Sequence, residues 1–268
     1  MSNTPGLRPE PEPRDTLPRT PSFRLDGKRA LVTGAGRGIG VAVAAALADA
    51  GAAVTLAARS RHEVENVADA IRAQGGAADP LTLDICDVAR VTAALADRAP
   101  YDILVNNAGT NRPAFFTDVS PEDFDAVFAI NVRAAFFVSQ AVVEGMKKAG
   151  RPGSIIHMSS QMGHVGGERR TVYCATKHAI EGLTKAMAIE LGPHKIRVNS
   201  LCPTFIETPM TRPFFADPAF RARVLDKISL GRLGQIEDVM GAVVFLASDA
   251  SALMTGASLV VDGGWTAA

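Results

Sequence analysis

The sequence predicts one α/β domain, a doubly wound parallel sheet with helices on both faces. Short apolar runs, typical of buried parallel strands, alternate along the chain with longer segments of helical periodicity. The first apolar run leads into a glycine-rich turn and then into an alanine-rich helix. At 268 residues the chain is long enough for one such sheet, and it shows no repeat beyond the alternation of strands and helices.

The charge balance and the cysteines argue against several classes of protein. The chain has 28 basic and 28 acidic residues, so no positive excess indicates nucleic acid or an anionic membrane as a partner. Cys86, Cys174 and Cys202 lack the paired spacing of a disulfide framework or a zinc site, which predicts no metal and fits a reducing cytoplasm. The longest apolar runs, such as residues 39–48, are too short to cross a bilayer, and the first residues lack a signal-peptide core. We therefore expect a cytoplasmic protein that acts on a small molecule.

The first 21 residues differ in composition from the rest of the chain. Six prolines stand there among charged residues with almost nothing to bury, namely Pro5, Pro9, Pro11, Pro13, Pro18 and Pro21. We expect residues 1–21 to form a disordered arm, or alternatively a strap over a neighbouring subunit. The single domain then extends over residues 22–268.

A phosphate-binding turn is predicted directly after the first strand, residues 29–33. Gly34, Gly38 and Gly40 follow in a Gly-x-x-x-Gly-x-Gly spacing, unlike the commoner Gly-x-Gly-x-x-Gly, and a helix extends to about Ala50. Glycines let the backbone approach a pyrophosphate, and the helix N-terminus offers free amide hydrogens and a partial positive charge. The alternative is a turn with a purely structural role.

The end of the second predicted strand, residues 53–58, decides which dinucleotide fits. An acidic residue roughly twenty positions beyond the glycines would bind the ribose hydroxyls of NAD, whereas an arginine suits the 2′-phosphate of NADP. The chain has Arg59 there, and Arg37 inside the glycine turn is a second candidate partner for that phosphate. The pattern favours NADP(H) over NAD(H), unless both arginines are merely solvated.

Further strand and helix signals continue the alternation. They predict a helix at 61–73, a strand at 81–84, a helix to about 98 and a strand at 103–105. Ligands of such sheets bind at the carboxyl ends of the strands, where Asp84, Asn106 and Gly109 stand. Each polar residue can equally be a turn or cap residue.

A long helix is expected from about Pro121 to Lys148, with an interruption near Asn131. Asn131 lies in an otherwise apolar stretch, and a buried asparagine must find hydrogen-bond partners. This residue is therefore either a structural bracket or part of a proton relay.

The pair Tyr173 and Lys177 is the main chemical signal of the chain. Four residues apart on a predicted helix, both side chains leave the same face, and an ammonium one turn away favours the phenolate. The preceding predicted strand, residues 154–160, ends in two serines and contains His157, which fits a core histidine. In isolation, the tyrosine and lysine could be an ordinary exposed pair.

The last third of the chain completes the predicted sheet. It contains a helix to about 191, a strand at 196–201, a final helix at about 235–248 and a strand at 258–261. Between them, residues 204–233 carry recurring prolines and phenylalanines around short helical pieces. This composition favours a segment that covers the substrate, although a long loop with its own small core is the alternative.

From about Leu25 to its C-terminus the chain resembles the short-chain dehydrogenase/reductase family. The motifs that carry the resemblance agree in order and spacing; they are Thr33 to Gly40, Asn106-Asn107-Ala108-Gly109, Asn131, Ser160, Tyr173 and Lys177. The resemblance implies a Rossmann-type domain and hydride transfer between a nicotinamide dinucleotide and a carbonyl or secondary alcohol. It also implies a homodimer or homotetramer.

The resemblance assigns roles to individual residues. In the implied catalytic set, Ser160 holds the substrate oxygen and Tyr173 exchanges its proton. Lys177 binds the nicotinamide ribose and lowers the tyrosine pKa, while Asn131 anchors a relay water. The predicted dinucleotide contacts, besides Tyr173 and Lys177, are Thr33, Gly34, Arg37, Gly38, Ile39, Gly40, Arg59, Asp84, Ile85, Asn106, Ala108, Gly109, Pro203, Ile206 and Thr208. Thr204 departs from the family pattern, which often has glycine there.

The substrate depends on fewer residues. The ending Val261 to Trp265 and the Ser160-Gln161 pair resemble members that act on gluconate-like and deoxy-keto sugar acids, so a sugar acid or polyol is expected. Arg169 and Arg170 could pair with a substrate carboxylate, or could be surface charges or subunit contacts. The candidate substrate contacts are Gln161, His164, Arg169 and Phe205.

Two alternatives remain at the level of sequence. One is a reductase of a hydrophobic ketone or a 3-oxoacyl thioester, favoured by Phe205, Phe214 and Phe215. The other is a catalytically silent dinucleotide-binding sensor, which would have a broken Ser-Tyr-Lys set. The set in this chain is complete.

Overall fold

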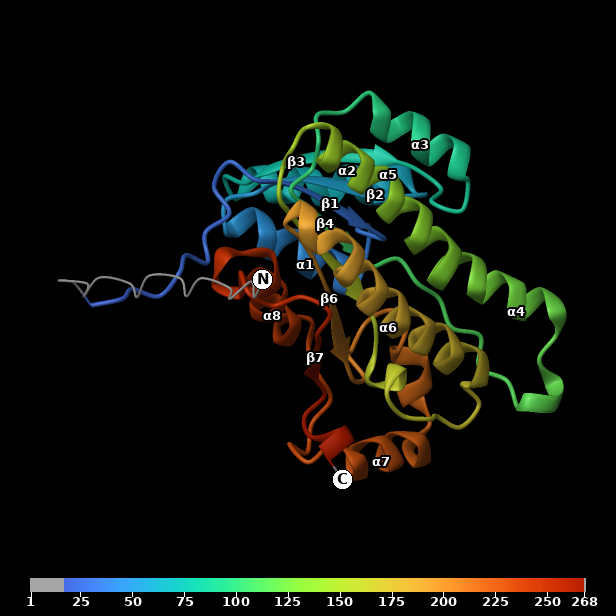
Figure 1. Ribbon diagram of the computed structural model, residues 1–268. Helices are drawn as coiled ribbons and strands as arrows, with labels where there is room; N and C mark the ends of the chain where they lie inside the picture. Colours follow the sequence, from blue (N-terminus) through green and yellow to red (C-terminus); the bar gives the residue numbers. More distant parts are fainter. Residues whose placement is uncertain (1–16, 268) are drawn as a thin grey trace, which may run out of the picture.

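A seven-stranded parallel sheet in the order β3-β2-β1-β4-β5-β6-β7 forms the centre of the protein (Figure 1). The computed structural model describes residues 17–267, so most of the predicted N-terminal arm lies outside the described residues. The strands are β1 (Arg29–Thr33), β2 (Ala53–Ala58), β3 (Ala77–Thr82), β4 (Ile103–Asn106), β5 (Gly153–Met158), β6 (Ile196–Pro203) and β7 (Ser258–Val261). The predicted fold class is confirmed.

Helices cover both faces of the sheet, and the strand side chains alternate between them. Val32 packs into the core formed with α1 (Ile39–Asp49), α2 (Arg61–Ala73) and α8 (Met240–Ala247). The adjacent Leu31 points into the opposite core. The helices of that second core are α3 (Val88–Ala96), α5 (Ala135–Lys148) and α6 (Thr171–Leu191). This alternation follows from the two-residue period of a strand.

The order of the strands creates a crevice beside β1. The chain moves outward from β1 through β2 to β3, and it then returns so that β4 pairs with the other side of β1, with Ala30 opposite Ile103. Loops that leave the carboxyl ends of β1 and β4 therefore diverge to opposite faces of the sheet. Such a point is where open α/β sheets bind ligands.

The third strand differs from the prediction. It spans Ala77–Thr82 instead of residues 81–84, because it pairs along its whole length with β2, from Ala53 opposite Ala77 to Ala58 opposite Thr82. Pro80 is compatible with this position because β3 is an edge strand. Asp84 consequently lies in the turn beyond the strand.

The expected helix break at Asn131 is a turn of π-helix. Residues Ala129–Ala134 form this turn between α4 (Pro121–Phe128) and α5. By length and composition, the combined stretch Pro121–Lys148 could cross a membrane. The uninterrupted apolar runs of the sequence are all shorter, and so they did not predict this candidate. Here it packs against α3 and α6, as core helices of water-soluble folds do, so its length is weak evidence for a membrane span.

The last third of the chain differs from the predicted element bounds in two places. The final helix begins with a short 3-10 turn, Ile236–Val239, and continues as α8 only to Ala247, where Ser248 turns into extended backbone. The strand β6 continues to Pro203, two residues beyond its predicted end at Leu201, because Cys202 and Pro203 pair with β7. The segment predicted as a cover contains a 3-10 turn, Arg212–Ala216, and α7 (Pro218–Lys227).

Candidate active site

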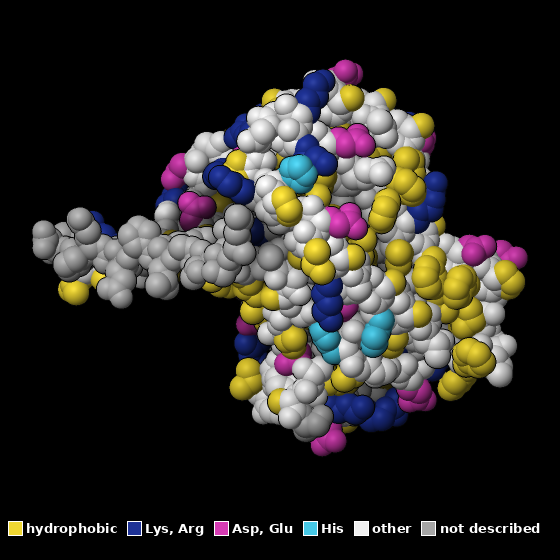
Figure 2. All heavy atoms as spheres, in the orientation of Figure 1, with side chains coloured by type: hydrophobic (Ala, Val, Ile, Leu, Met, Phe, Trp, Pro, Cys, Tyr) yellow, Lys and Arg dark blue, Asp and Glu magenta, His cyan; other side chains and the backbone are white. Residues whose placement is uncertain are grey.

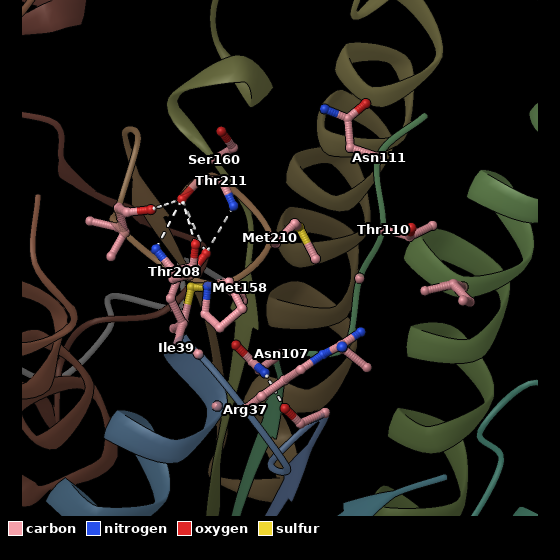
Figure 3. Close-up of a pocket in the computed structure, with 18 of the residues that line it drawn as sticks. Arg37, Ile39, Asn107, Thr110, Asn111, Met158, Ser160, Thr208, Met210 and Thr211 are labelled. Atoms are coloured by element: carbon pink, nitrogen blue, oxygen red, sulfur yellow. Dashed lines mark hydrogen bonds between the residues drawn. The ribbon is translucent and has the colours of Figure 1, made fainter. Parts of the chain in front are cut away.

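A cavity of about 470 Å³ lies at the carboxyl ends of the strands. Its walls come from the glycine turn after β1, the loops after β2, β4, β5 and β6, and the start of α6. Figure 3 shows Arg37 and Asn107 on one side of it, and Ser160, Thr208 and Thr211 on another. One cavity therefore brings together the predicted phosphate turn and the predicted proton-transfer residues.

The glycine turn leaves room for a phosphate at the start of α1. Gly34 has φ +65°, and a Cβ there would lie 2.8 Å from Ala108 Cα, so a larger residue cannot be accommodated. A Cβ on Gly40 would collide with the Gly34 carbonyl oxygen and lie 2.7 Å from Asn107 Nδ2. Gly38 precedes α1 and puts no side chain over its first amides. These features fit a pyrophosphate at the helix N-terminus.

Thr33 and Asn107 hold the glycine turn against the loop after β4. Thr33 Oγ1 accepts hydrogen bonds from the backbone amides of Asn107 and Ala108, both at 3.1 Å. Asn107 Nδ2 donates to the carbonyl oxygens of Thr33, at 2.9 Å, and Gly34, at 3.2 Å. Thr33 is buried and lies outside the cavity wall, whereas Asn107 and Ala108 line it. Asn107 belongs to a motif singled out in the sequence, but its bracketing role depends on a contact that sequence alone does not specify.

Two arginines line the end of the cavity next to β2. Arg37, in the glycine turn, and Arg59, directly after β2, both contribute to the wall. Neither forms a salt bridge within residues 17–267. Glu63, in the first turn of α2, also lines this end and was not predicted; only its position three residues after the helix cap Ser60 could have indicated it.

Asp84 and Asn106 have different positions despite their similar predictions. Asp84 lines the cavity with Ile85, and its Oδ1 accepts a 3.0 Å hydrogen bond from the Cys86 amide. Asn106 lies in the core, outside the cavity wall, where its Nδ2 contacts Ser139 Oγ at 2.8 Å and His157 Nδ1 at 3.2 Å. The structure therefore places Asn106 as a bracket beneath the site rather than beside a dinucleotide.

Asn131 lies in the π-helical turn and hydrogen-bonds to the loop after β4 and to α6. Its Nδ2 donates to Thr110 O, at 2.9 Å, and to Thr176 Oγ1, at 3.0 Å, while its Oδ1 accepts from the Thr110 amide at 2.8 Å. It is buried and does not line the cavity, although a Cβ on Gly109 would lie 3.3 Å from its Oδ1 and 3.9 Å from Lys177 Nζ. Both open interpretations of Asn131, bracket and relay member, are compatible with this position beside Lys177.

Ser160, Tyr173 and Lys177 meet at the cavity wall. Ser160 follows β5 and donates a 2.9 Å hydrogen bond to Gln161 Oε1. Tyr173 and Lys177 lie one turn apart on α6, with Lys177 Nζ 5.4 Å from the centre of the tyrosine ring. Lys177 Nζ also donates to the Met158 carbonyl oxygen at 2.8 Å, which directs the ammonium toward the end of β5.

Burial controls the ionisation of both residues on α6. It raises the pKa of the Tyr173 phenol to about 12, an effect that the Ser160 hydroxyl partly opposes. It lowers the pKa of the Lys177 ammonium to about 8, while Cys202 and Glu181 act in the opposite direction. The phenol is therefore protonated at neutral pH, as a proton donor to a carbonyl oxygen must be.

The loop after β6 forms the wall facing the glycine turn. Pro203, Ile206 and Thr208, which the resemblance assigns to the carboxamide end of the dinucleotide, all line the cavity. The hydroxyl groups of Thr208 and Thr211 lie 3.2 Å apart, and Thr211 Oγ1 donates to the Ile206 carbonyl oxygen at 2.5 Å (Figure 3). These bonds fix the backbone that follows the strand.

The four candidate substrate contacts divide into two groups. Gln161 and Phe205 line the cavity. His164 lies outside the cavity wall, with Nε2 3.9 Å from Glu181 Oε2, and Arg169 lies outside it as well, with Cζ 5.1 Å above the Phe115 ring. The neighbouring Arg170 takes the position in the wall.

The fold also brings together a polar group of two buried residues, Glu181 and Cys202, and the exposed His164. Potential metal-ligand atoms of His164, Glu181 and Cys202 lie within 4.8 Å of one another, although the cysteines are dispersed in the sequence. Ser200 and Ser258 both donate to the Glu181 carboxylate, the former at 2.8 Å, and Cys202 Sγ approaches it at 3.4 Å. Because neutral donors already surround this carboxylate, the group is better described as a hydrogen-bonded network.

Comparisons with known proteins find similar chains over nearly the whole length. A family model described as Enoyl-(Acyl carrier protein) reductase matches residues 34–266. The L-xylulose reductase of Mus musculus is 44% identical over 243 residues, which cover 91% of this chain and 98% of that protein. The gluconate 5-dehydrogenase of Gluconobacter oxydans is 40% identical over 248 residues, covering 91% of this chain and 96% of that protein. A gluconate 5-dehydrogenase from Burkholderia cenocepacia, solved with NADP and tartrate, has a TM-score of 0.89 and 40% identity, covering 92% of this chain and 98% of that one.

Proposed function

The chain belongs to the short-chain dehydrogenase/reductase family, and we propose that it transfers a hydride between NADP(H) and a carbonyl or secondary alcohol of a sugar acid or polyol. It is an oxidoreductase that acts on CH–OH or C=O groups, like its relatives. The observation that carries the proposal is the meeting of Ser160, Tyr173 and Lys177 in the cavity that also contains the glycine turn. A candidate proton donor and a turn suited to a phosphate thus share one cavity.

The cavity residues would divide the chemistry as follows. A nicotinamide group, when bound, supplies or accepts the hydride. Ser160 would hold the substrate oxygen, and Tyr173 would donate its proton to that oxygen in reduction or accept it in oxidation. Lys177 would hold the nicotinamide ribose and stabilise the phenolate with its positive charge. Asn131 hydrogen-bonds to Thr110 and Thr176, and it would anchor a relay water beside Lys177.

The preference for NADP(H) over NAD(H) is supported by Arg37 and Arg59. Both line the end of the cavity next to β2, and the residue at the end of that strand, Ala58, carries no carboxylate to bind ribose hydroxyls. The relative from B. cenocepacia was solved with NADP. Glu63 lines the same end, but neither arginine forms a salt bridge within residues 17–267, so both guanidinium groups suit a 2′-phosphate.

A sugar-type substrate is supported by the relatives and by the polar lining. Two relatives are named for L-xylulose and gluconate, and the B. cenocepacia enzyme was solved with tartrate, a small hydroxy acid. Gln161 and Ser160 supply hydrogen-bonding groups at the same end of the cavity. A 3-oxoacyl thioester or hydrophobic ketone is the second candidate, because Phe205, Phe214 and Met210 also line the cavity.

The segment of residues 204–233 would cover the substrate. Several of its first residues line the cavity, and the rest packs into a small separate core with Val224, Ile228 and Leu233. We include this segment in a single domain that extends over residues 22–268.

Self-association as a homodimer or homotetramer in the cytoplasm completes the proposal. Figure 2 shows hydrophobic side chains gathered along the α4–α5 stretch, where Phe124 and Phe136 are 44% and 43% exposed. Light scattering coupled to size exclusion would measure the mass of the particle, and a monomer at micromolar concentration would contradict this part.

One experiment tests the reaction itself. Purified protein would be assayed with NADPH and NADH separately against a panel of neutral ketoses, keto-aldonates and 3-oxoacyl thioesters. We expect NADPH-dependent turnover of sugar-type substrates. Tight dinucleotide binding without turnover of any panel member would instead favour a catalytically silent sensor.

A further inference from the structure

Arg170 is a buried cation that faces the cavity. The residue is 7% exposed, lines the cavity wall, and immediately precedes α6, three positions before Tyr173. Its guanidinium makes one hydrogen bond within residues 17–267, from Nη1 to the Arg169 carbonyl oxygen at 3.3 Å, and no salt bridge there. Most of its five donors therefore have no partner in the described part of the chain.

Two other arginines, one partly buried and one more exposed, have the acceptors that Arg170 lacks. Arg197 is also partly buried, and its guanidinium donates to the carbonyl oxygens of Leu246, Ser248 and Met254. Arg151 pairs with the carboxylate of Asp102 at 2.7 Å. Arg170 differs from both because the groups around it supply almost no acceptors.

The side chain is nevertheless held in place. Its Cζ lies 5.1 Å from the centre of the Phe214 ring, so the guanidinium plane is supported by an aromatic side chain of the covering segment. Burial lowers the pKa of Arg170, and the charge of Arg169 adds to this effect. Burying a cation is costly unless it is paired, so the site would gain from an anion that enters the cavity.

We propose that Arg170 binds the carboxylate of the substrate and thereby makes a keto or hydroxy acid of sugar type the preferred substrate over a neutral ketose or polyol. This inference rests on the proposed function, since it assumes that Ser160 and Tyr173 hold the reacting oxygen. A planar guanidinium can bind a carboxylate through two parallel hydrogen bonds, which fixes its orientation as well as its position. With the carboxylate fixed three residues before Tyr173, the substrate chain would extend toward Ser160 and Gln161.

The neighbouring arginine provides a matched control. Arg169 has the same charge and lies one residue away, but its guanidinium stacks on Phe115 outside the cavity wall. A long-range charge effect would make Arg169→Gln and Arg170→Gln similar. A direct carboxylate contact would make only Arg170→Gln defective toward acids.

The experiment compares two sugars that differ in one group. 5-Keto-D-gluconate and L-sorbose share their carbon chain, but L-sorbose has a hydroxymethyl group in place of the carboxylate. With NADPH, we expect Arg170→Gln to lower kcat/KM about tenfold to a hundredfold for the keto acid and less than about threefold for L-sorbose. Arg170→Lys should recover part of the loss, and Arg169→Gln should change either value less than about threefold. Equal losses on both sugars, or no loss on the acid, would overturn the proposal.

Binding measurements separate this inference from the proposed reaction. Calorimetric titration of the NADPH-loaded protein with D-gluconate reports on the carboxylate contact without turnover, because the reduced cofactor cannot accept a hydride from the alcohol. We expect the wild type to bind and Arg170→Gln to bind at least about tenfold more weakly. If no member of the substrate panel is turned over, the proposed function fails, but the difference in gluconate affinity still decides the role of Arg170. Equal gluconate affinity in both proteins would refute that role.

Discussion

Lys177 Nζ lies 5.4 Å from the ring centre of Tyr173, one helical turn away, and is anchored by the carbonyl oxygen of Met158. Both side chains are buried, and burial alone would favour the neutral form of each. The protonation states of Tyr173 and Lys177 therefore depend on which charged or polar groups enter the cavity. A cationic nicotinamide ring would favour the phenolate, and a carbonyl oxygen would accept the phenol proton.

The first prediction concerns the phenol itself. Tyr173→Phe keeps the ring and removes the hydroxyl, so it should lower kcat at least about a hundredfold while the Kd for NADPH stays within about threefold. Steady-state kinetics and quenching of protein fluorescence by NADPH measure the two quantities. Substantial residual turnover in the variant would remove Tyr173 from the reaction.

A second prediction concerns the ionisation of Tyr173. Since its pKa is raised to about 12, the cofactor-free protein should show no Tyr173 phenolate below about pH 10. The chain has two tyrosines, so subtracting the ultraviolet titration of Tyr173→Phe from that of the wild type isolates this phenol. Addition of NADP+ should move the difference signal to lower pH by at least about one unit, because it adds positive charge. A Tyr173-dependent phenolate signal below about pH 9 in the free protein would contradict the burial argument.

Cofactor choice can be tested at the end of β2. Arg59→Gln should raise KM for NADPH about tenfold to a hundredfold through loss of the 2′-phosphate contact, and should change KM for NADH less than about threefold. Arg61→Gln is the matched control, because Arg61 is exposed and pairs with Glu65 at 2.7 Å outside the cavity wall. If the ratio of NADPH to NADH efficiency is the same in Arg59→Gln and the wild type, Arg59 does not select the cofactor.

Local sequence signals were sufficient for most of the sheet. The predicted bounds of β2, β7 and α2 agree with the structure, because β2 and β7 are mostly apolar runs and α2 has a clear helical period that begins after the cap Ser60. β3 was misplaced because its residues, Ala-Ala-Asp-Pro-Leu-Thr, form no apolar run. Pairing with β2 decides where that strand lies, and a pattern within β3 itself does not contain this information.

The cavity was predictable where its residues belong to compact motifs. The glycine turn, Ser160 and the Tyr173–Lys177 pair all line it. Thr33, Asn106 and Asn131 also stand in motifs, yet they lie behind the wall. Thr33 and Asn131 hydrogen-bond to the loop after β4, whereas Asn106 hydrogen-bonds to Ser139 on α5. A motif identifies the neighbourhood of a residue, whereas side-chain direction depends on tertiary contacts.

The two adjacent arginines illustrate the same limit in the loop before α6. Arg169 has φ +58°, in the left-handed region, so the backbone changes direction at this residue. As a result Arg169 stacks on Phe115, whereas Arg170 stacks on Phe214 inside the cavity. No sequence pattern in Glu168-Arg169-Arg170 indicates which arginine turns inward.

The last prediction concerns the acid stability of the core. Burial lowers the pKa of His157 to about 4; the charge of Lys177 acts in the same direction and that of Glu181 opposes it. The unfolded chain binds a proton near the ordinary histidine pKa of about 6.5, and the folded protein does not until about pH 4, so the free energy of unfolding falls as pH decreases through this window. This one group should account for a loss of about 2 kcal/mol between pH 6.5 and 5, and about 3 kcal/mol in all.

His157→Gln keeps an acceptor for Asn106 Nδ2 but cannot titrate. Urea unfolding of both cofactor-free proteins at about pH 7.5 and about pH 5, at one protein concentration, should show about 2 kcal/mol less acid destabilisation in the variant. Equal acid destabilisation in the two proteins would mean that another group binds the proton.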